Sequence, residues 1–260
     1  MVLFFGCMAS LSNLKLISLN FERSRHLERN IPFLRKERPD ILCGQEVFEG
    51  DIERISSDLD MPFRVWLRDT LIGEGKNVPG KGGYSGIVLF SRYPLSRVGY
   101  EYYHVPESGI TEEKTAETCY ETNANGIVWA SIEVDGREYA FVNTHFTWSV
   151  ADCPNDAQRV SFVALRNLLE KLGPNILSGD LNAPRGRGMW EEFVSFYGQD
   201  NIPKEITTTI DQELHRKKGL QLVVDGIFAQ APYAVNDIRV VPGMSDHQAI
   251  VASVSYQEIE

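Results

Sequence analysis

Apolar segments of strand length alternate with amphipathic helical stretches from residue 14 to residue 256, and this alternation limits the chain to folds that combine sheets and helices. Residues 14–19 predict a buried strand, residues 24–38 a helix that ends before Pro39, and residues 40–45 a second strand. The chain therefore opens with a β-α-β unit. It contains no internal repeat and no Ser/Pro-rich linker.

The rest of the chain predicts many more strands than helices. Asp135-Gly136 lies between two strand-like runs and is a strong signal for a two-residue hairpin. The further expected strands cover residues 62–67, 84–91, 95–104, 126–134, 137–146, 175–179, 220–229, 235–241 and 249–255, and the further expected helices cover 155–172 and 189–197. This pattern favours the α/β (α+β) class, with two mixed sheets packed face to face and helices outside them.

The longest expected helix, residues 155–172, has clear start and stop signals. Asn155 or Asp156 is the expected N-cap, and Gly173-Pro174 ends the helix. Its expected buried face consists of apolar residues at helical spacing, namely Val160, Val163, Ala164, Leu168, Leu169 and Leu172.

The size and composition are those of a globular protein. Of the 260 residues, 43% are hydrophobic and 24% charged, which is enough apolar material for a sizeable core. We expect a single domain over residues 13–260, monomeric, preceded by a terminal extension, residues 1–12, that we expect to be disordered. No run approaches the roughly 18 apolar residues of a membrane span, so we expect no membrane insertion.

The charge balance limits the partners. The 26 Lys and Arg residues against 36 Asp and Glu residues give a net charge of −10, which excludes a chain-wide basic surface for nucleic acid. The segment 101–121 contains six glutamates and only Lys114 as a cation, and it would repel an extended polyanion if it borders the active site. We therefore expect no long nucleic-acid track. The absence of Cys-x-x-Cys and of an export signal favours a reducing, cytoplasmic setting.

Polar side chains follow the expected buried strands at five places, where loops on a rigid scaffold usually hold reactive groups. These places are Asn20 with Glu22, Gln45-Glu46, Asn143-Thr144-His145, Asp180-Leu181-Asn182 and Ser245-Asp246-His247. Each one alone also fits a turn residue, a solvated charge or, for Asp180 and Asn182, an Asx-turn. Asp225, inside the apolar run 222–228, is expected to be buried and therefore to need a cation or several donors.

Together these residue types suit one kind of chemistry. Carboxylate and amide oxygens without clustered thiols are ligands for a hard divalent cation such as Mg²⁺ or Mn²⁺. Histidines beside such a cation can donate to phosphate oxygens, and a separate aspartate can orient or deprotonate an attacking water. The sequence therefore predicts metal-assisted hydrolysis at phosphorus.

The order of these motifs resembles that of the endonuclease/exonuclease/phosphatase superfamily over about residues 14–255. The matching runs are Leu16-Ile17-Ser18-Leu19-Asn20, Gln45-Glu46-Val47, Gly83-Tyr84-Ser85-Gly86, Phe90-Ser91-Arg92-Tyr93-Pro94-Leu95, Asn143-Thr144-His145-Phe146, Ser178-Gly179-Asp180-Leu181-Asn182 and Ser245-Asp246-His247. The resemblance implies a four-layer α/β sandwich and Mg²⁺-dependent hydrolysis of a phosphoester.

The resemblance also implies roles for individual residues. Glu46 would be the principal metal ligand, with Asn20, Glu22 and Asp246 completing the metal or water shell. The residues at the phosphate would be Asp180, which activates the water, Asn182 and His145, which contact phosphate oxygens, and His247, which donates to the phosphate while Asp225 orients it. Glu22 is a departure, since several family members carry Asp at that position.

Residues in the loops are expected to determine which substrate the protein binds. The candidate substrate-binding residues are Tyr84, Trp148, Arg185 and Arg187, and the basic run 215–218 precedes the strand that carries Asp225. These cations also fit ordinary solvated charges, and most of the tryptophans fit core positions. The loop 75–81 imitates a phosphate-binding P-loop but lacks the Ser or Thr that the motif requires.

Two classes of function follow. The first is a Mg²⁺-dependent phosphodiesterase acting by in-line attack of an activated water, with a phosphomonoesterase on an inositol phosphate, lipid head group or nucleotide as the alternative. The second is a catalytically silent binding module on the same fold. Every matched catalytic position carries a competent residue, with only Glu22 altered, which favours the enzyme.

Overall fold

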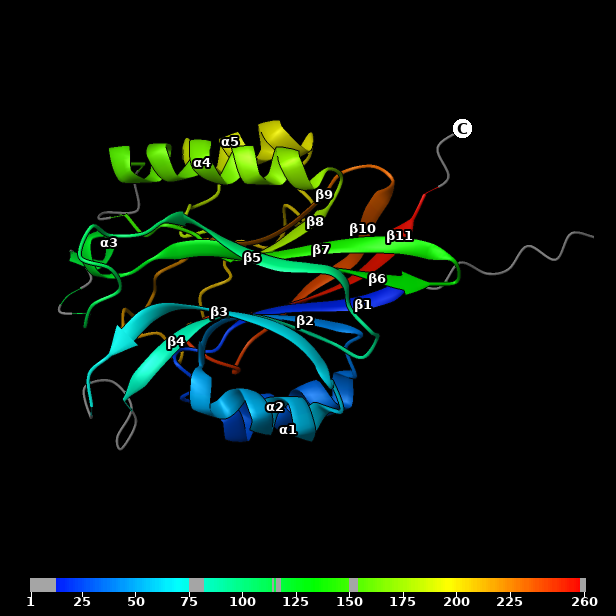
Figure 1. Ribbon diagram of the computed structural model, residues 1–260, viewed down its shortest axis with the longest axis horizontal. Coiled ribbons are helices and arrows are strands. Elements are labelled where there is room, and N and C mark those ends of the chain that lie inside the picture. The colour runs from blue at the N-terminus through cyan, green and yellow to red at the C-terminus, as the bar shows by residue number, and fades with distance from the viewer. Residues whose placement is uncertain (1–12, 75–81, 114, 116–117, 150–153, 258–260) are drawn as a thin grey trace, which may run out of the picture.

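The computed structural model describes residues 13–74, 82–113, 115, 118–149 and 154–257. The expected terminal extension (1–12), the P-loop imitation (75–81) and Lys114 lie outside the described residues. Two sheets pack against each other, and helices cover the outer face of each sheet (Figure 1). The predicted four-layer α/β sandwich is confirmed.

The first sheet has six strands in the order β10-β11-β1-β2-β4-β3. Their bounds are β1 (Leu14–Asn20), β2 (Ile41–Phe48), β3 (Phe63–Ile72), β4 (Gly83–Ser91), β10 (Tyr233–Val241) and β11 (Ala249–Tyr256). Strands β1 and β2 are parallel, and the other neighbours are antiparallel. Helices α1 (Leu27–Glu37) and α2 (Ile52–Leu59) cover its outer face (Figure 1).

The second sheet has five strands in the order β5-β6-β7-β8-β9. Their bounds are β5 (Ser96–His104), β6 (Asn125–Val134), β7 (Arg137–His145), β8 (Ile176–Asp180) and β9 (Asp225–Ala229). Only β7 and β8 pair in parallel, so this sheet is mixed as well. Helices α4 (Asp156–Leu172) and α5 (Met189–Tyr197) lie outside it, and the short α3 (Cys119–Thr122) precedes β6.

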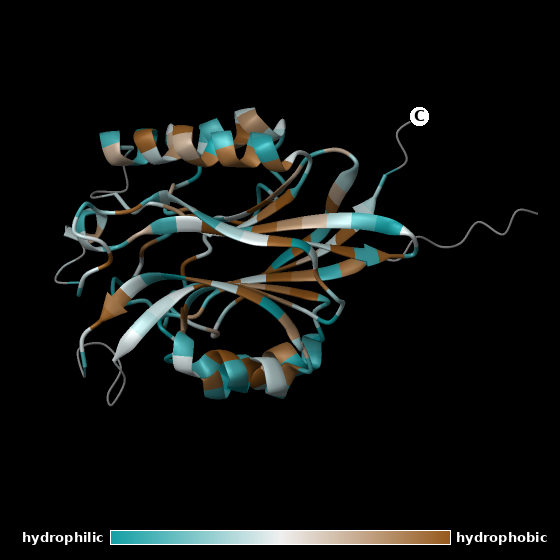
Figure 2. Cartoon of the chain, in the orientation of Figure 1, coloured by the Kyte–Doolittle hydropathy of each residue, from teal (hydrophilic) through white to brown (hydrophobic). Residues whose placement is uncertain are grey.

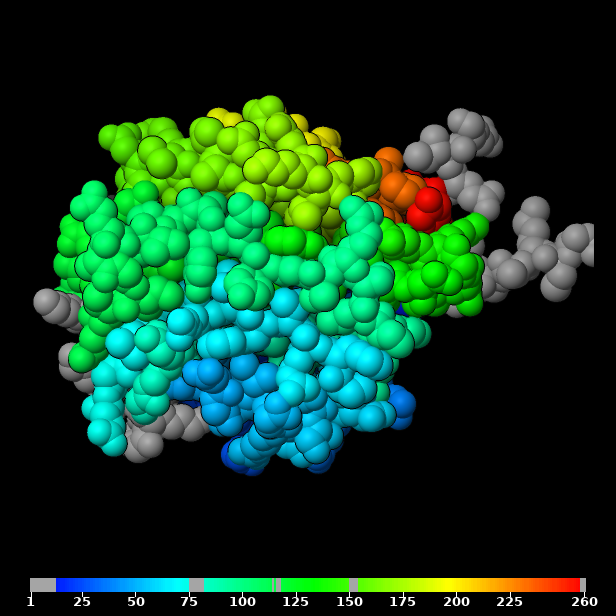
Figure 3. Space-filling view, viewed as in Figure 1, coloured from blue at the N-terminus to red at the C-terminus, as the bar shows by residue number. Residues whose placement is uncertain are grey.

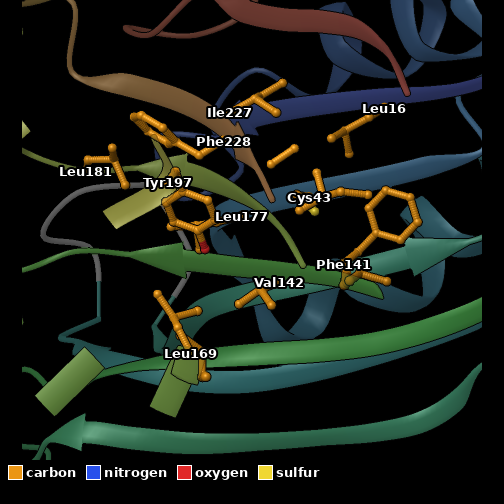
Figure 4. Close-up of a cluster of buried hydrophobic side chains, with 14 of the residues drawn as sticks. Leu16, Cys43, Phe141, Val142, Leu169, Leu177, Leu181, Tyr197, Ile227 and Phe228 are labelled. Carbon is orange, nitrogen blue, oxygen red and sulfur yellow. The ribbon is translucent and has the colours of Figure 1, made fainter. Parts of the chain in front are cut away.

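The main core lies between the two sheets and under α4 and α5. Its buried residues are almost all apolar. In Figure 2 the helices carry both hydrophobic and hydrophilic residues, as expected for helices with one buried and one exposed face. Figure 4 shows part of this core, where Phe141, Leu177 and Phe228 come from three adjacent strands of the second sheet. A second buried cluster fills the space under α1 and α2. In the space-filling view the blue-to-cyan and green-to-yellow parts of the chain close against each other without a gap (Figure 3).

The buried face of α4 matches the predicted one only in part, since Leu168 and Leu169 are buried as expected. Val160 and Val163 are 64% and 61% exposed, whereas Gln158, Phe162 and Leu165 face inward. The reason is the polar start of the helix: the Gln158 amide donates to the carbonyls of Thr147 and Asn182, which fixes the rotation of the helix. Asn155 is the N-cap, as predicted, and accepts from the backbone N–H of Gln158 at 2.8 Å.

Other element boundaries also differ from the prediction. Helix α1 begins at Leu27 rather than at residue 24, and α2 was not predicted at all. The expected strand 220–229 is regular only from Asp225, because the backbone groups of Val223 and Val224 bond to loops instead of to a neighbouring strand. Among the described residues, no helix has both the length and the apolar character that a membrane crossing requires.

Candidate active site

Three site residues lie in one row across the second sheet. His145 ends β7 and pairs with Asp180, which ends β8, and Asp180 pairs with Asp225, which begins β9. Because their strands are adjacent and in register, the three side chains emerge at the same edge. Asn20 ends β1 in the other sheet, and its side-chain Nδ2 donates to Asp180 Oδ2 at 3.0 Å. The site therefore forms where the two sheets meet.

Asn20 connects two carboxylates. Besides Asp180, its Nδ2 lies 3.3 Å from Glu46 Oε1, and its Oδ1 accepts from the backbone N–H of Glu22 at 2.9 Å. The amide therefore orients both acids, while the backbone bond uses one of the two lone pairs of Oδ1.

A β-bulge aims Glu46 into the site. The register between β2 and β4 shifts between Gly44 and Val47, and Glu46 adopts a φ of 52°. Gln45, the other bulge residue, instead turns into the sheet interface and donates to Asn143 Oδ1 at 2.7 Å. The bulge thus lets two adjacent polar side chains point in different directions.

His247 is held between two aspartates. Its Nδ1 donates to Asp225 Oδ2 at 2.9 Å, and its Nε2 lies 3.6 Å from Asp180 Oδ2. Burial alone would lower the pKa of His247, but Asp225 and Asp180 raise it well above its ordinary value. Burial raises the pKa of Asp225. The predicted burial of Asp225 is confirmed, since it is 3% exposed.

Asp69 is a site residue that the sequence reasoning missed. It lies on β3 at an irregularity in the pairing with β4, and its Oδ2 is 3.9 Å from Nδ1 of His145. Burial raises the pKa of Asp69 to about 7. Burial alone would lower the pKa of His145, whereas Asp180, Glu46 and Asp69 raise it. The sequence gives little signal for it, because Asp69 lies between the polar residues Arg68 and Thr70 and the strand was expected to end at residue 67.

Asp246 offers an unsatisfied oxygen. Its Oδ1 is buried and has no hydrogen-bond partner within the described part of the chain, and burial raises the pKa of Asp246 to about 7. A buried carboxylate oxygen without a donor is suited to a cation. With Glu46 nearby, the donor set is oxygen-rich and fits Mg²⁺ or Mn²⁺ better than a thiol-seeking metal.

A tight turn holds Asn182 beside Asp180. The backbone N–H of Asn182 donates to Asp180 Oδ1 at 2.9 Å, so the Asx-turn reading is correct, and the residue has a φ of 46°. The Asn182 Nδ2 donates to the Phe146 carbonyl at 2.9 Å. This turn fixes the orientation of both side chains.

These groups open into one cleft of about 590 Å³. The predicted site residues that line it are Glu22, Glu46, His145, Trp148, Asp180, Asn182, Asp246 and His247, and Asn20 and Asp225 are hydrogen-bonded directly to that set. From the acidic segment, Glu113 lines the cleft and forms an ion pair with Arg23 at 2.8 Å. Side chains from position 20 to position 247 thus converge at one place.

The turn that follows β1 is strained. Glu22, Arg23 and Ser24 all have positive φ values of 45°, 58° and 57°, a conformation that costs free energy in non-glycine residues. The Ser24 hydroxyl accepts from the backbone N–H of Phe48 at 3.0 Å and helps to hold the turn. The carboxylate of Glu22 is engaged by Arg25 and by His26, and its expected part in the metal shell, directly or through water, stays a prediction.

Three predicted substrate-binding residues have other surroundings. The Tyr84 ring packs under the Arg68 guanidinium at 4.7 Å. Arg185 donates to the carbonyls of Ile202, Pro203 and Ile206 and pairs with Asp200, so it holds the loop after α5. Arg187 is exposed, and neither arginine is among the described residues that line the cleft. Only Trp148 of this group lies at the cleft.

Comparison with known proteins agrees with this geometry. A family model described as Endonuclease/Exonuclease/phosphatase family matches residues 18–247. No curated protein gives a significant match.

Solved structures share the fold at low sequence identity. An endonuclease/exonuclease/phosphatase from Beutenbergia cavernae DSM 12333 has a TM-score of 0.73 at 16% identity, covering 94% of this chain and 72% of that chain. One from Bacteroides vulgatus has a TM-score of 0.68 at 18% identity, covering 95% and 100%. A mannosyl-6-phosphatase from Bacteroides thetaiotaomicron VPI-5482 has a TM-score of 0.65 at 16% identity, covering 94% and 100%. From the extent of the family match, the chain belongs to the endonuclease/exonuclease/phosphatase family.

Proposed function

We propose that this protein is a divalent-metal-dependent phosphoesterase that hydrolyses a phosphodiester by in-line attack of an activated water. The observation that carries this proposal is the position of Asp180. One carboxylate oxygen, Oδ2, lies within 3.7 Å of donor atoms from Asn20, His145 and His247. A carboxylate surrounded in this way at the floor of a cleft is suited to orient a water and take its proton.

Glu46 and Asp246 would hold the cation, and the Asn20 amide would orient Glu46. The cation, Mg²⁺ or Mn²⁺, would neutralise charge on the phosphate and polarise its oxygens. The unpartnered Oδ1 of Asp246 supports this assignment. Glu22 would take part in the metal shell, directly or through water.

Histidine and asparagine side chains of the protein would stabilise the charge that develops at phosphorus. His247 would donate from Nε2 to a phosphate oxygen, while Asp225 holds the other ring nitrogen and keeps the ring oriented. His145 would contact a second oxygen with Asp69 beside its Nδ1. Asn182, held by its turn, would present its side chain at the phosphate.

A phosphomonoesterase is the second candidate. The fold neighbour from Bacteroides thetaiotaomicron is named a mannosyl-6-phosphatase, which shows that this fold can house a monoesterase. Trp148 and Tyr120 line the same cleft and could hold the ring of a sugar or nucleoside leaving group.

The test is a Mg²⁺ titration with bis-p-nitrophenyl phosphate and with p-nitrophenyl phosphate. We expect metal-dependent release, faster from the diester, and a loss of at least about 10³-fold in Asp180→Asn. Asp135→Asn, at the exposed hairpin, is the matched control and should keep full activity. A lack of release from both compounds, together with no heat of Mg²⁺ binding by calorimetry, would favour the silent binding module.

We also infer a cytoplasmic, monomeric protein. The localisation rests on cysteine usage, since Cys43 and Cys119 are free thiols in the described part of the chain. Size-exclusion chromatography with light scattering tests the monomer.

A further inference from the structure

The rim of the cleft contains a basic turn. Leu214, His215 and Arg216 line the cleft, in the segment that leads toward β9. The same cleft is also lined by the acids Asp69 and Glu113.

Arg216 is the cleft arginine whose charge is not matched by an acid. Of the three arginines that line the cleft, Arg23 pairs with Glu113 and lies 3.7 Å from Glu46, and Arg25 pairs with Glu22. Within the described ranges, the Arg216 guanidinium makes no hydrogen bond and no ion pair, and the residue is exposed. An exposed guanidinium without a carboxylate is available for a ligand anion.

His215 adds a second polar side chain beside it. Its Nδ1 lies 3.1 Å from the backbone nitrogen and 3.2 Å from the carbonyl oxygen of Lys217, and these local contacts leave Nε2 as the ring nitrogen without a partner among the described residues. Burial lowers the pKa of His215, and nearby His247 and Arg216 lower it further. The ring is therefore neutral near pH 7, and Nε2 is the nitrogen that can contact a ligand.

The turn is held rigidly against the catalytic segment. The Asp211 carboxylate accepts from the backbone N–H groups of Glu213 and Leu214, both at 2.9 Å, and from Gly243 at 2.6 Å. The Asp211 N–H in turn donates to the carbonyl of Asp246. Because Asp246 and His247 are adjacent, the basic turn keeps a fixed position relative to the phosphate site, and little ordering is needed on binding.

We propose that His215 and Arg216 form a second anion subsite, so that the preferred substrate is a small molecule carrying a second phosphate group besides the scissile phosphoester. This proposal rests on the proposed function and specifies its substrate class. A long nucleic acid fits less well, because Glu22 and Glu113 line the same cleft and the protein carries a net charge of −10.

Matched substrate pairs test the subsite. Thymidylyl-thymidine with and without a 5′-phosphate is the diester pair, and glucose 6-phosphate with glucose 1,6-bisphosphate is the monoester pair. For the class that the enzyme hydrolyses, we expect the member with the second phosphate to have a KM about tenfold lower. Arg216→Ala should raise that KM about tenfold, leave kcat unchanged and leave the partner compound unaffected. Arg216→Lys should restore part of the preference.

Lys217→Ala is the matched control, since Lys217 is the next cation in the turn, is exposed and is not a lining residue. The proposal is overturned if Arg216→Ala changes both members of a pair equally, if Lys217→Ala has the same effect, or if only a single-stranded oligonucleotide depends on Arg216. Dissociation constants of the same pairs, measured by calorimetry, test whether the second anion subsite exists without relying on turnover. Absence of metal-dependent hydrolysis in the wild type would contradict the proposed function alone.

Discussion

Asn20 and Asp180 lie 160 positions apart in the chain and in different sheets, and a hydrogen bond of 3.0 Å joins their side chains. Both are almost fully buried, at 1% exposure each. The same Asn20 amide faces Glu46, so a neutral donor separates two acids that would otherwise repel each other. The geometry of the site therefore depends on the relative position of the two sheets.

Replacing this bridge should cost both activity and metal affinity. In Asn20→Ala, Glu46 and Asp180 lose a shared donor, and we expect kcat to fall by about 10- to 100-fold and the half-saturating Mg²⁺ concentration to rise. Removal of a buried hydrogen-bonding group should also lower the free energy of unfolding by about 1–3 kcal/mol. Metal titration of activity and urea unfolding measure these effects. Unchanged Mg²⁺ dependence would contradict the bridging role.

Asp225 should act on catalysis through the His247 ring. In Asp225→Asn the acceptor for Nδ1 loses its charge, so the pKa of His247 should fall and its orientation should loosen. We expect kcat to drop by about 10²-fold or more, with the acidic limb of the activity profile intact and the loss of activity at high pH shifted to lower pH. A pH profile of kcat/KM in both proteins checks the direction. Asp225→Glu, which restores the charge, should recover part of the rate; no recovery would indicate a packing role.

Much of the fold and of the site was predictable because the signals are local. Asn20, His145 and Asp180 each stand at the end of an apolar strand. A polar residue at the end of an apolar run can be recognised from the sequence alone. The Asp135-Gly136 hairpin is confirmed by positive φ values of 52° and 73°, as its turn type requires. The burial of Asp225 followed from its apolar neighbours alone.

The remaining features depend on contacts that sequence periodicity does not contain. Asp69 lies on a strand irregularity, so alternation along β3 could not place its side chain. Arg185 follows the Asp180–Asn182 motif directly, yet the carbonyls of a distant loop hold its guanidinium. The outward face of Val160 is set by the bonds of Gln158 rather than by apolar spacing.

The surroundings of Arg185 predict a structural effect without a kinetic one. Arg185→Ala should lower the free energy of unfolding by about 2–3 kcal/mol, because three carbonyls and Asp200 lose a charged partner. KM should remain within about twofold for any substrate, since the side chain lies outside the cleft lining. Arg187→Ala, at an exposed position two residues later, is the comparison and should destabilise less. A large KM change in Arg185→Ala would instead support the prediction that Arg185 contacts the substrate.

The raised pKa of Asp69 predicts that the stability of the metal-free protein falls as the pH rises. Burial raises its pKa to about 7 from an ordinary value of 3.8, so the folded state holds a proton that the unfolded state has released. The stabilising contribution is complete below about pH 4 and is lost as the pH rises through about 7. The raised pKa of His145 acts in the same direction, because its stabilising proton is also lost at higher pH.

Urea unfolding in EDTA at pH 5 to 8 measures this contribution as the difference between Asp69→Asn and the wild type. The variant lacks the titrating carboxyl, so its stability relative to the wild type should increase with pH by up to about 1.4 kcal/mol per unit and level off above about pH 7. Thr70→Ala removes the hydroxyl that donates to Asp69 Oδ1 at 2.8 Å and favours the charged form. It should therefore move the loss of stability to higher pH. A constant difference between Asp69→Asn and the wild type across this range would mean that Asp69 is already ionised in the folded protein at pH 5, because His145, Thr70 and Arg23 outweigh the effect of burial.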